Sequence, residues 1–236
     1  PMTDERITNL EAATKDLEER PGWRAPSWEL ERVQAILHAL TEDRAGARSR
    51  YERAGGARGR ALLGIVVLHQ GDYPAAIDLL ERARKEGQEG LEGDLGLARL
   101  RSGDVDEAIV LLRSRIEIAP DDVVARANLG AALLSKGDYA GARNELRAAL
   151  DAAPWLDEAE FNLGQSYGKG GDGARGVFHL ARAFELRGEV ERALSQYEKA
   201  EKLLPEGSAE SEEAKRRVEM LRQVVTERVL GRQRSR

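Results

Sequence analysis

Two asparagines stand at equivalent places in successive segments of the sequence and could bind a peptide backbone. Asn128 and Asn162 are 34 residues apart, and each precedes a Gly-Asp pair by nine residues. A primary amide both donates and accepts hydrogen bonds, so it can pair with the N–H and the C=O of an extended peptide. The alternative is that both are solvated or inter-repeat polar residues. The spacing makes them candidate peptide-binding residues.

Four more side chains continue the same surface by their spacing. Phe161 would add an apolar anchor and Arg182 a cation, and Gln165 and His179 lie between them in sequence. The competing interpretation is core packing for Phe161 and a solvated charge for Arg182. The predicted partner-binding set is therefore Asn128, Phe161, Asn162, Gln165, His179 and Arg182.

No pattern in the sequence indicates catalysis, a metal or a cofactor. The three histidines, His38, His69 and His179, are too far apart for an HExxH zinc motif, in which two histidines are four residues apart. The chain has no cysteine, so thiolate chemistry and disulfides are excluded. Residues 168–173 are rich in glycine but lack the Lys-Ser/Thr ending of a nucleotide loop, and we interpret them as a flexible turn. We expect a chain that is not an enzyme.

The composition favours helices and a protein partner. The 236 residues include 33% charged and 5% aromatic side chains. Alanine, leucine, glutamate and arginine dominate, and these lose little rotamer freedom in a helix. The net charge of −5 is spread over mixed charges, whereas nucleic-acid binding needs a concentrated basic face. No apolar run is long enough for a membrane span or signal peptide. We expect neither nucleic acid nor a membrane as partner.

The elements that would position the candidate residues are set by an internal repeat. Five glycines, each followed by an acidic residue, are separated by 32, 34, 34 and 17 residues. A glycine or alanine stands seven residues before each, another small residue five after, and a leucine or tyrosine nine after. These offsets place small and large residues on the facing sides of two helices, where they interlock. The repeated glycines are Gly71, Gly103, Gly137, Gly171 and Gly188.

This pattern resembles the tetratricopeptide repeat (TPR), a helix-turn-helix unit of about 34 residues. The resemblance implies an all-α solenoid: a right-handed superhelix of antiparallel helix pairs whose first helices line a concave groove that binds a protein or peptide. We expect a degenerate repeat at 27–56, the array at 57–207, and a C-terminal capping helix with a basic tail at 208–236. Residues 174–187 can be the second helix of one unit or the first of the next.

Two departures from the family pattern bear on ligands and on geometry. The Lys, Asn and Arg pattern with which chaperone-binding TPR proteins hold a terminal carboxylate is absent, because Ala61, Ile65 and Asp94 occupy the matching places. Arg115 replaces an expected alanine, so we expect a looser or bent junction there.

A narrower resemblance concerns the start of the chain. Residues 1–10 resemble the HP-x-T-x-E-R-I-x-x-L segment that follows the catalytic core of BepA-type bacterial envelope zinc metallopeptidases, and residues 27–33 resemble the start of that family's TPR region. The resemblance implies that 1–26 form a helix and linker at the edge of an absent peptidase domain, and that the chain is periplasmic. The alternative is a free-standing TPR adaptor of a bacterial complex, with the cytoplasm left open.

Overall fold

The computed structural model describes residues 27–234, with side chains as far as Glu227. Within this range the chain forms α-helices and no strands, which confirms the all-α prediction. Residues 1–26, where we predict a helix and a linker, lie outside the described residues. The helices are α2 (Trp28–Thr41), α3 (Arg44–Glu52), α4 (Gly56–His69), α5 (Tyr73–Lys85), α6 (Glu92–Ser102), α7 (Val105–Ile118), α8 (Val123–Lys136), α9 (Tyr139–Ala152), α10 (Asp157–Lys169), α11 (Gly173–Leu186), α12 (Val190–Leu203) and α13 (Ala209–Arg234).

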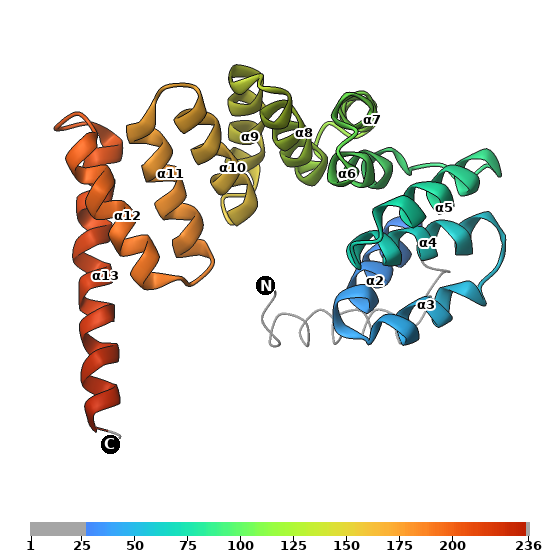
Figure 1. Ribbon diagram of the computed structural model, residues 1–236, viewed down its shortest axis with the longest axis horizontal. Coiled ribbons are helices and arrows are strands. Elements are labelled where there is room, and N and C mark those ends of the chain that lie inside the picture. Colours follow the sequence, from blue (N-terminus) through green and yellow to red (C-terminus); the bar gives the residue numbers. More distant parts are fainter. Residues whose placement is uncertain (1–26, 235–236) are drawn as a thin grey trace. The chain divides into compact units, whose positions relative to one another are not determined.

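The chain divides into two compact units, with the boundary between Arg115 and Ile116 near the end of α7. In each unit, consecutive helices follow one another as hairpins (Figure 1). The boundary falls beside the arginine that replaces the repeat's alanine. At the equivalent place in other repeats, Ala83 and Ala149 are completely buried. A long charged side chain cannot fill so small a space, so the packing differs at this point.

The turns between paired helices explain why glycine and aspartate recur together. Gly71, Gly137 and Gly171 have φ angles of 85°, 87° and 93°, a left-handed conformation in which only glycine is free of strain. The next residue caps the following helix: the Asp138 carboxylate, for example, accepts a hydrogen bond of 2.9 Å from the backbone N–H of Gly141. Each Gly-Asp pair therefore ends one helix and begins the next.

In the pairs α4–α5, α6–α7 and α8–α9, a glycine of the first helix lies against a leucine of the second. A Cβ atom built on Gly130 would lie 2.5 Å from Cγ of Leu146, and one on Gly96 would lie 2.7 Å from Cγ of Leu112. Gly64 has the same relation to Leu80, at 2.8 Å. The three leucines are completely buried. Any side chain at these glycines would collide with the core, so the glycine fixes how closely the two helices approach.

The closest approach occurs between α10 and α11. A Cβ on Gly164 would lie 2.9 Å from the carbonyl oxygen of Gly176, and one on Gly176 would lie 3.0 Å from that of Gly164. Here Gly176 replaces the alanine that other repeats have five residues after the turn, such as Ala142. With glycine on both sides, the two backbones themselves come into contact.

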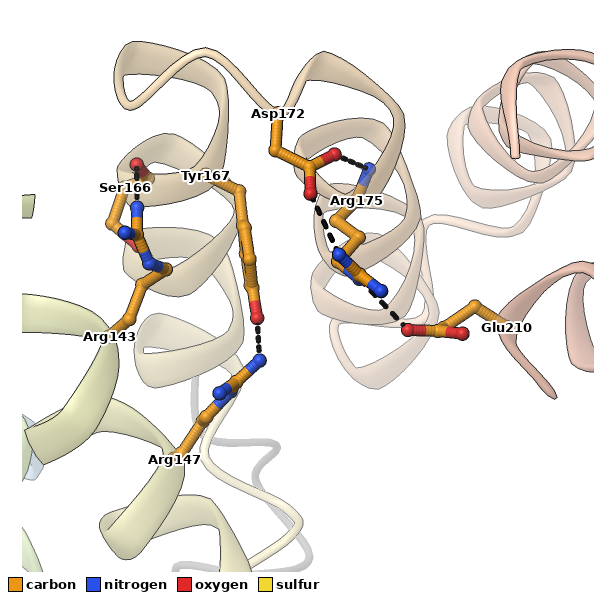
Figure 2. Close-up of polar contacts among 7 residues, drawn as sticks. All are labelled: Arg143, Arg147, Ser166, Tyr167, Asp172, Arg175 and Glu210. Atoms are coloured by element: carbon orange, nitrogen blue, oxygen red, sulfur yellow. Dashed lines mark hydrogen bonds and ion pairs between the residues drawn. The ribbon is translucent and has the colours of Figure 1, made fainter. Parts of the chain in front are cut away.

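Helix α11 also packs on α12 and α13. The rings of Phe178 and Tyr197 meet edge to face with centroids 6.0 Å apart. The Tyr197 hydroxyl donates a 2.8 Å hydrogen bond to Glu185, and burial together with this carboxylate raises the pKa of the phenol. Nε of Arg175 donates to Glu210 of α13 at 3.0 Å, as Figure 2 shows. Residues 174–187 therefore pack against α10 as the second helix of one pair and against α12 as the first helix of the next.

In the first unit, a partly buried ion pair joins two helices that are far apart in sequence. Arg32 of α2 donates two hydrogen bonds, of 2.6 and 2.7 Å, to the two oxygens of Asp94 on α6. Asp94 is 1% exposed. Ala61 and Ile65, at the other two places of the terminal-carboxylate pattern, are completely buried. These three positions therefore have internal roles in the first unit.

We expect Gly130→Ala to lower the free energy of unfolding by about 2 kcal/mol, because the added methyl group overlaps Leu146 in a filled core. Gly168→Ala is the matched control: it is also inside a helix, but its Cβ would meet nothing within 4 Å. It should be neutral or stabilise by up to about 1 kcal/mol, the helix propensity difference. Urea denaturation measures both. Equal effects of the two substitutions would contradict this packing.

Candidate peptide-binding groove

The surface between α8 and α10 is hollowed into a pocket of about 170 Å³. Both helices belong to the second unit and pack side by side. A cavity of about 150 Å³ is large enough for a benzene-sized group, so this pocket could accept one apolar side chain of a ligand. Its wall is formed by Val124, Ala127, Asn128, Leu156, Asp157, Glu158, Ala159 and Asn162.

The structure brings the two predicted asparagines together in this pocket. Asn128 comes from α8 and Asn162 from α10, and both side chains are partly buried at the pocket wall. Within residues 27–227, neither amide has a hydrogen-bond partner. Each lies four residues after another wall residue, Val124 or Glu158, so helix geometry puts them on the pocket side. Their placement agrees with the sequence analysis, and peptide binding by them stays a prediction.

Two acidic residues are part of the pocket wall. Asp157 and Glu158 stand in the first turn of α10, where the positive end of the helix dipole stabilises carboxylates. Nε of Arg187, just after α11, donates a 2.6 Å hydrogen bond to the Asp157 carboxylate. The pocket thus combines apolar carbon, two amides and two acidic groups.

Phe161 and Gln165 lie on α10 but do not line the pocket. The Arg187 guanidinium lies over the Phe161 ring, 5.0 Å from its centroid, so the aromatic face is already in contact with a cation. Gln165 is partly buried and has no hydrogen-bond partner in the described part of the chain. Their predicted contacts with a partner remain predictions.

His179 and Arg182 meet at a buried carboxylate that the sequence analysis did not single out. Nδ1 of His179 lies 2.8 Å from one oxygen of Glu160, and Nε of Arg182 lies 2.9 Å from the other. Glu160 is 1% exposed. A buried carboxylate requires such partners, because an unpaired charge away from water is costly. The signal in the sequence was an acid beside Ala159, Leu163 and Gly164 on the packing side of α10.

His179 also contacts the ring of Tyr167, which in turn lies beside two arginine side chains. The rings of Tyr167 and His179 are stacked, with an interplanar angle of 1° and centroids 5.2 Å apart. Arg143 and Arg147 of α9 lie 5.3 and 5.4 Å from the Tyr167 centroid. Arg147 also donates to the Tyr167 hydroxyl, and Arg143 donates to the carbonyl of Ser166 (Figure 2). His179 and Arg182 therefore link α10 to α11, and a contact with a partner would be additional.

The described residues contain neither a group suited to a metal ion nor a membrane-spanning helix. No group of three or more His, Asp or Glu residues is arranged there to hold a metal ion. None of the helices described is long and apolar enough to cross a membrane.

Comparison with known proteins agrees with the repeat pattern. Two family models described as tetratricopeptide repeat match residues 34–90 and 99–155. The chain carries tetratricopeptide repeats. The first matched TPR segment begins inside α2, so it includes part of the repeat that the sequence shows as degenerate. No curated protein matches the sequence.

Solved structures of TPR proteins share this fold. MamA of strain AMB-1 is 25% identical, with a TM-score of 0.54 over 67% of this chain and 98% of MamA. MamA from Desulfovibrio magneticus RS-1 is 18% identical, with a TM-score of 0.55 over 69% of this chain and 96% of that one. YrrB, described as a TPR protein with an unusual peptide-binding site, is 20% identical, with a TM-score of 0.54 over 81% of this chain and 97% of YrrB. The predicted TPR solenoid is confirmed.

We expect Glu160→Ala to lower the free energy of unfolding by about 3 kcal/mol, because it leaves Arg182 and His179 without their carboxylate. Gln165→Ala, on the same helix and also partly buried, should change it by less than about 0.5 kcal/mol. Chemical denaturation of both variants is the measurement. If the two substitutions cost the same, the Glu160 cluster is not a structural link.

Proposed function

We propose that this chain is a non-catalytic protein-interaction module that binds an extended peptide segment of another protein between α8 and α10. The observation that carries the proposal is the pair of amides, Asn128 and Asn162, at one pocket without hydrogen-bond partners in the described part of the chain. TPR proteins as a class bind proteins and peptides, and the YrrB description includes a peptide-binding site.

The amides and the apolar walls of the pocket would bind different parts of a peptide. Each amide can accept a hydrogen bond from a peptide N–H and donate one to a peptide C=O. Such pairs recognise a backbone irrespective of its side chains. The apolar walls from Val124 and Leu156 would take one side chain of the ligand and so supply selectivity.

We expect Asn162→Ala to weaken peptide binding about tenfold, since losing a well-formed hydrogen bond costs about 1.4 kcal/mol. The probe is a peptide selected against the wild-type protein from a phage-displayed random library. Thermal unfolding should change little. Asn144→Ala is the matched control, because Asn144 is exposed on α9 and lies outside the pocket wall. Failure to select any peptide, or equal affinities for the two variants, would overturn the proposal.

A narrower proposal concerns the biological setting. The resemblance of residues 1–10 and 27–33 to BepA-type enzymes supports a module that serves a bacterial envelope metallopeptidase by engaging substrate, partner or protease domain. It also supports a periplasmic location. The reading frame upstream of residue 1 is the test: an HExxH domain preceded by a signal sequence supports this setting. Any other upstream sequence favours the free-standing adaptor.

A further inference from the structure

A second hollow lies in the same unit, between α11 and α13. Its volume is about 500 Å³, and Tyr197 of α12 contributes to its wall. Ion pairs join the helices on either side: Arg175 to Glu210 and Arg217 to Glu185, each at 3.0 Å. The residues that line it are Pro154, Arg182, Glu185, Leu186, Tyr197, Glu213 and Arg217.

This second groove follows from the half-repeat step. Gly171 and Gly188 are only 17 residues apart, so α11 is the second helix of one pair and the first helix of the next. Helices α8 and α10 are successive first helices, and they form the first groove between them. Because α11 also acts as a first helix, α11 and α13 stand in the same relation and form a groove of the same kind.

The two grooves adjoin at two places. Pro154 lines the second groove and Leu156 the first, and two residues span at most about 7 Å. Leu186 lines the second groove, and the next residue, Arg187, is hydrogen-bonded to Asp157 in the wall of the first. The walls of the two grooves are therefore joined at these places.

Exposed apolar side chains lie in the walls of the two grooves or next to them in sequence. Trp155, between Pro154 and Leu156, is 63% exposed. Val124 in the wall of the first groove is 50% exposed and Leu186 in the wall of the second is 43% exposed. Tryptophan is among the side chains that most often dominate the energy of a protein interface.

The charged residues in the walls of the two grooves favour a cationic ligand. The walls of the two grooves contain four acidic residues and two basic ones: Asp157, Glu158, Glu185 and Glu213 against Arg182 and Arg217. Ion pairs within the protein join Asp157 to Arg187, Glu185 to Arg217 and Glu213 to Arg182. The acidic groups outnumber the basic ones, so the surface attracts positive charge.

We propose that one extended segment of a partner protein, with apolar residues flanked by lysine or arginine, occupies both grooves and crosses between them over Trp155. This inference rests on the proposed function and specifies its ligand. The asparagines bind the backbone in the first groove. Trp155 and Leu186 contact apolar side chains, and the excess of acidic side chains in the groove walls attracts the cationic ones.

The experiment compares two synthetic peptides of about 12 residues, long enough at roughly 3.3 Å per residue to cover both grooves. They carry the same leucines around a central proline, which prevents a helix, and differ only in having lysine or glutamate between the leucines. Fluorescence polarisation gives the dissociation constants. The lysine peptide should bind at least about tenfold more tightly, by about 1.4 kcal/mol, and its affinity should fall as salt is added. Equal affinities would overturn the charge assignment.

Three variants locate the lysine peptide. Trp155→Ala and Leu186→Ser should each weaken its binding at least about fivefold, roughly 1 kcal/mol. Met220→Ala should leave binding unchanged, because Met220 is exposed on α13 but lines neither groove. If Asn162→Ala weakens binding while Trp155→Ala and Leu186→Ser do not, the proposed function stands and the crossing is wrong. If Asn162→Ala, Trp155→Ala and Leu186→Ser all bind the peptide as the wild type does, the proposed function and the crossing are both wrong.

Discussion

The structure depends on the contact between one glycine and one leucine in the helix pairs α4–α5, α6–α7 and α8–α9. Where Gly64, Gly96 and Gly130 meet Leu80, Leu112 and Leu146, no Cβ fits. This contact fixes the separation of the two helices and therefore which of their residues face outward. In repeat proteins each unit packs on its neighbours, so the same helix spacing recurs along the chain. The pairing of Asn128 with Asn162 at one pocket is a consequence, because equal packing in successive repeats places equivalent residues side by side.

Helices α10 and α11 approach more closely still, because both have a glycine at the point of contact. Gly164 and Gly176 bring the two backbones into contact, and the shortened spacing to Gly188 makes α11 the second helix of one pair and the first helix of the next. The second groove lies between α11 and α13, and the exposed Trp155 stands between Pro154 in its wall and Leu156 in the wall of the first groove. The packing of α10 on α11 also makes Glu160, His179 and Arg182 part of the link between helices. Residues that the repeat pattern assigns to a binding surface can therefore be needed for packing where the pattern changes.

Much of the fold could be predicted from the sequence because the repeat fixes the turns and helix faces locally. The spacing of the glycines was enough to predict helix pairs and to bring Asn128 and Asn162 together. Contacts between distant residues were not predictable in this way. The Arg32–Asp94 pair joins residues that no local periodicity relates, and the buried position of Glu160 depends on which neighbour α11 packs against. Spacing showed that His179 shares a face with other candidates, but not that Glu160 lies opposite it.

The central claim is that the glycine–leucine contact sets the helix spacing, and a double-mutant cycle tests it most directly. The free energy of unfolding is measured for the wild type, Gly130→Ala, Leu146→Ala and the double variant. Leu146→Ala removes the atoms that an alanine at position 130 would strike. The account predicts that Gly130→Ala costs about 2 kcal/mol in the wild type but less than about 0.5 kcal/mol in the Leu146→Ala background. The same cost in both backgrounds would contradict it.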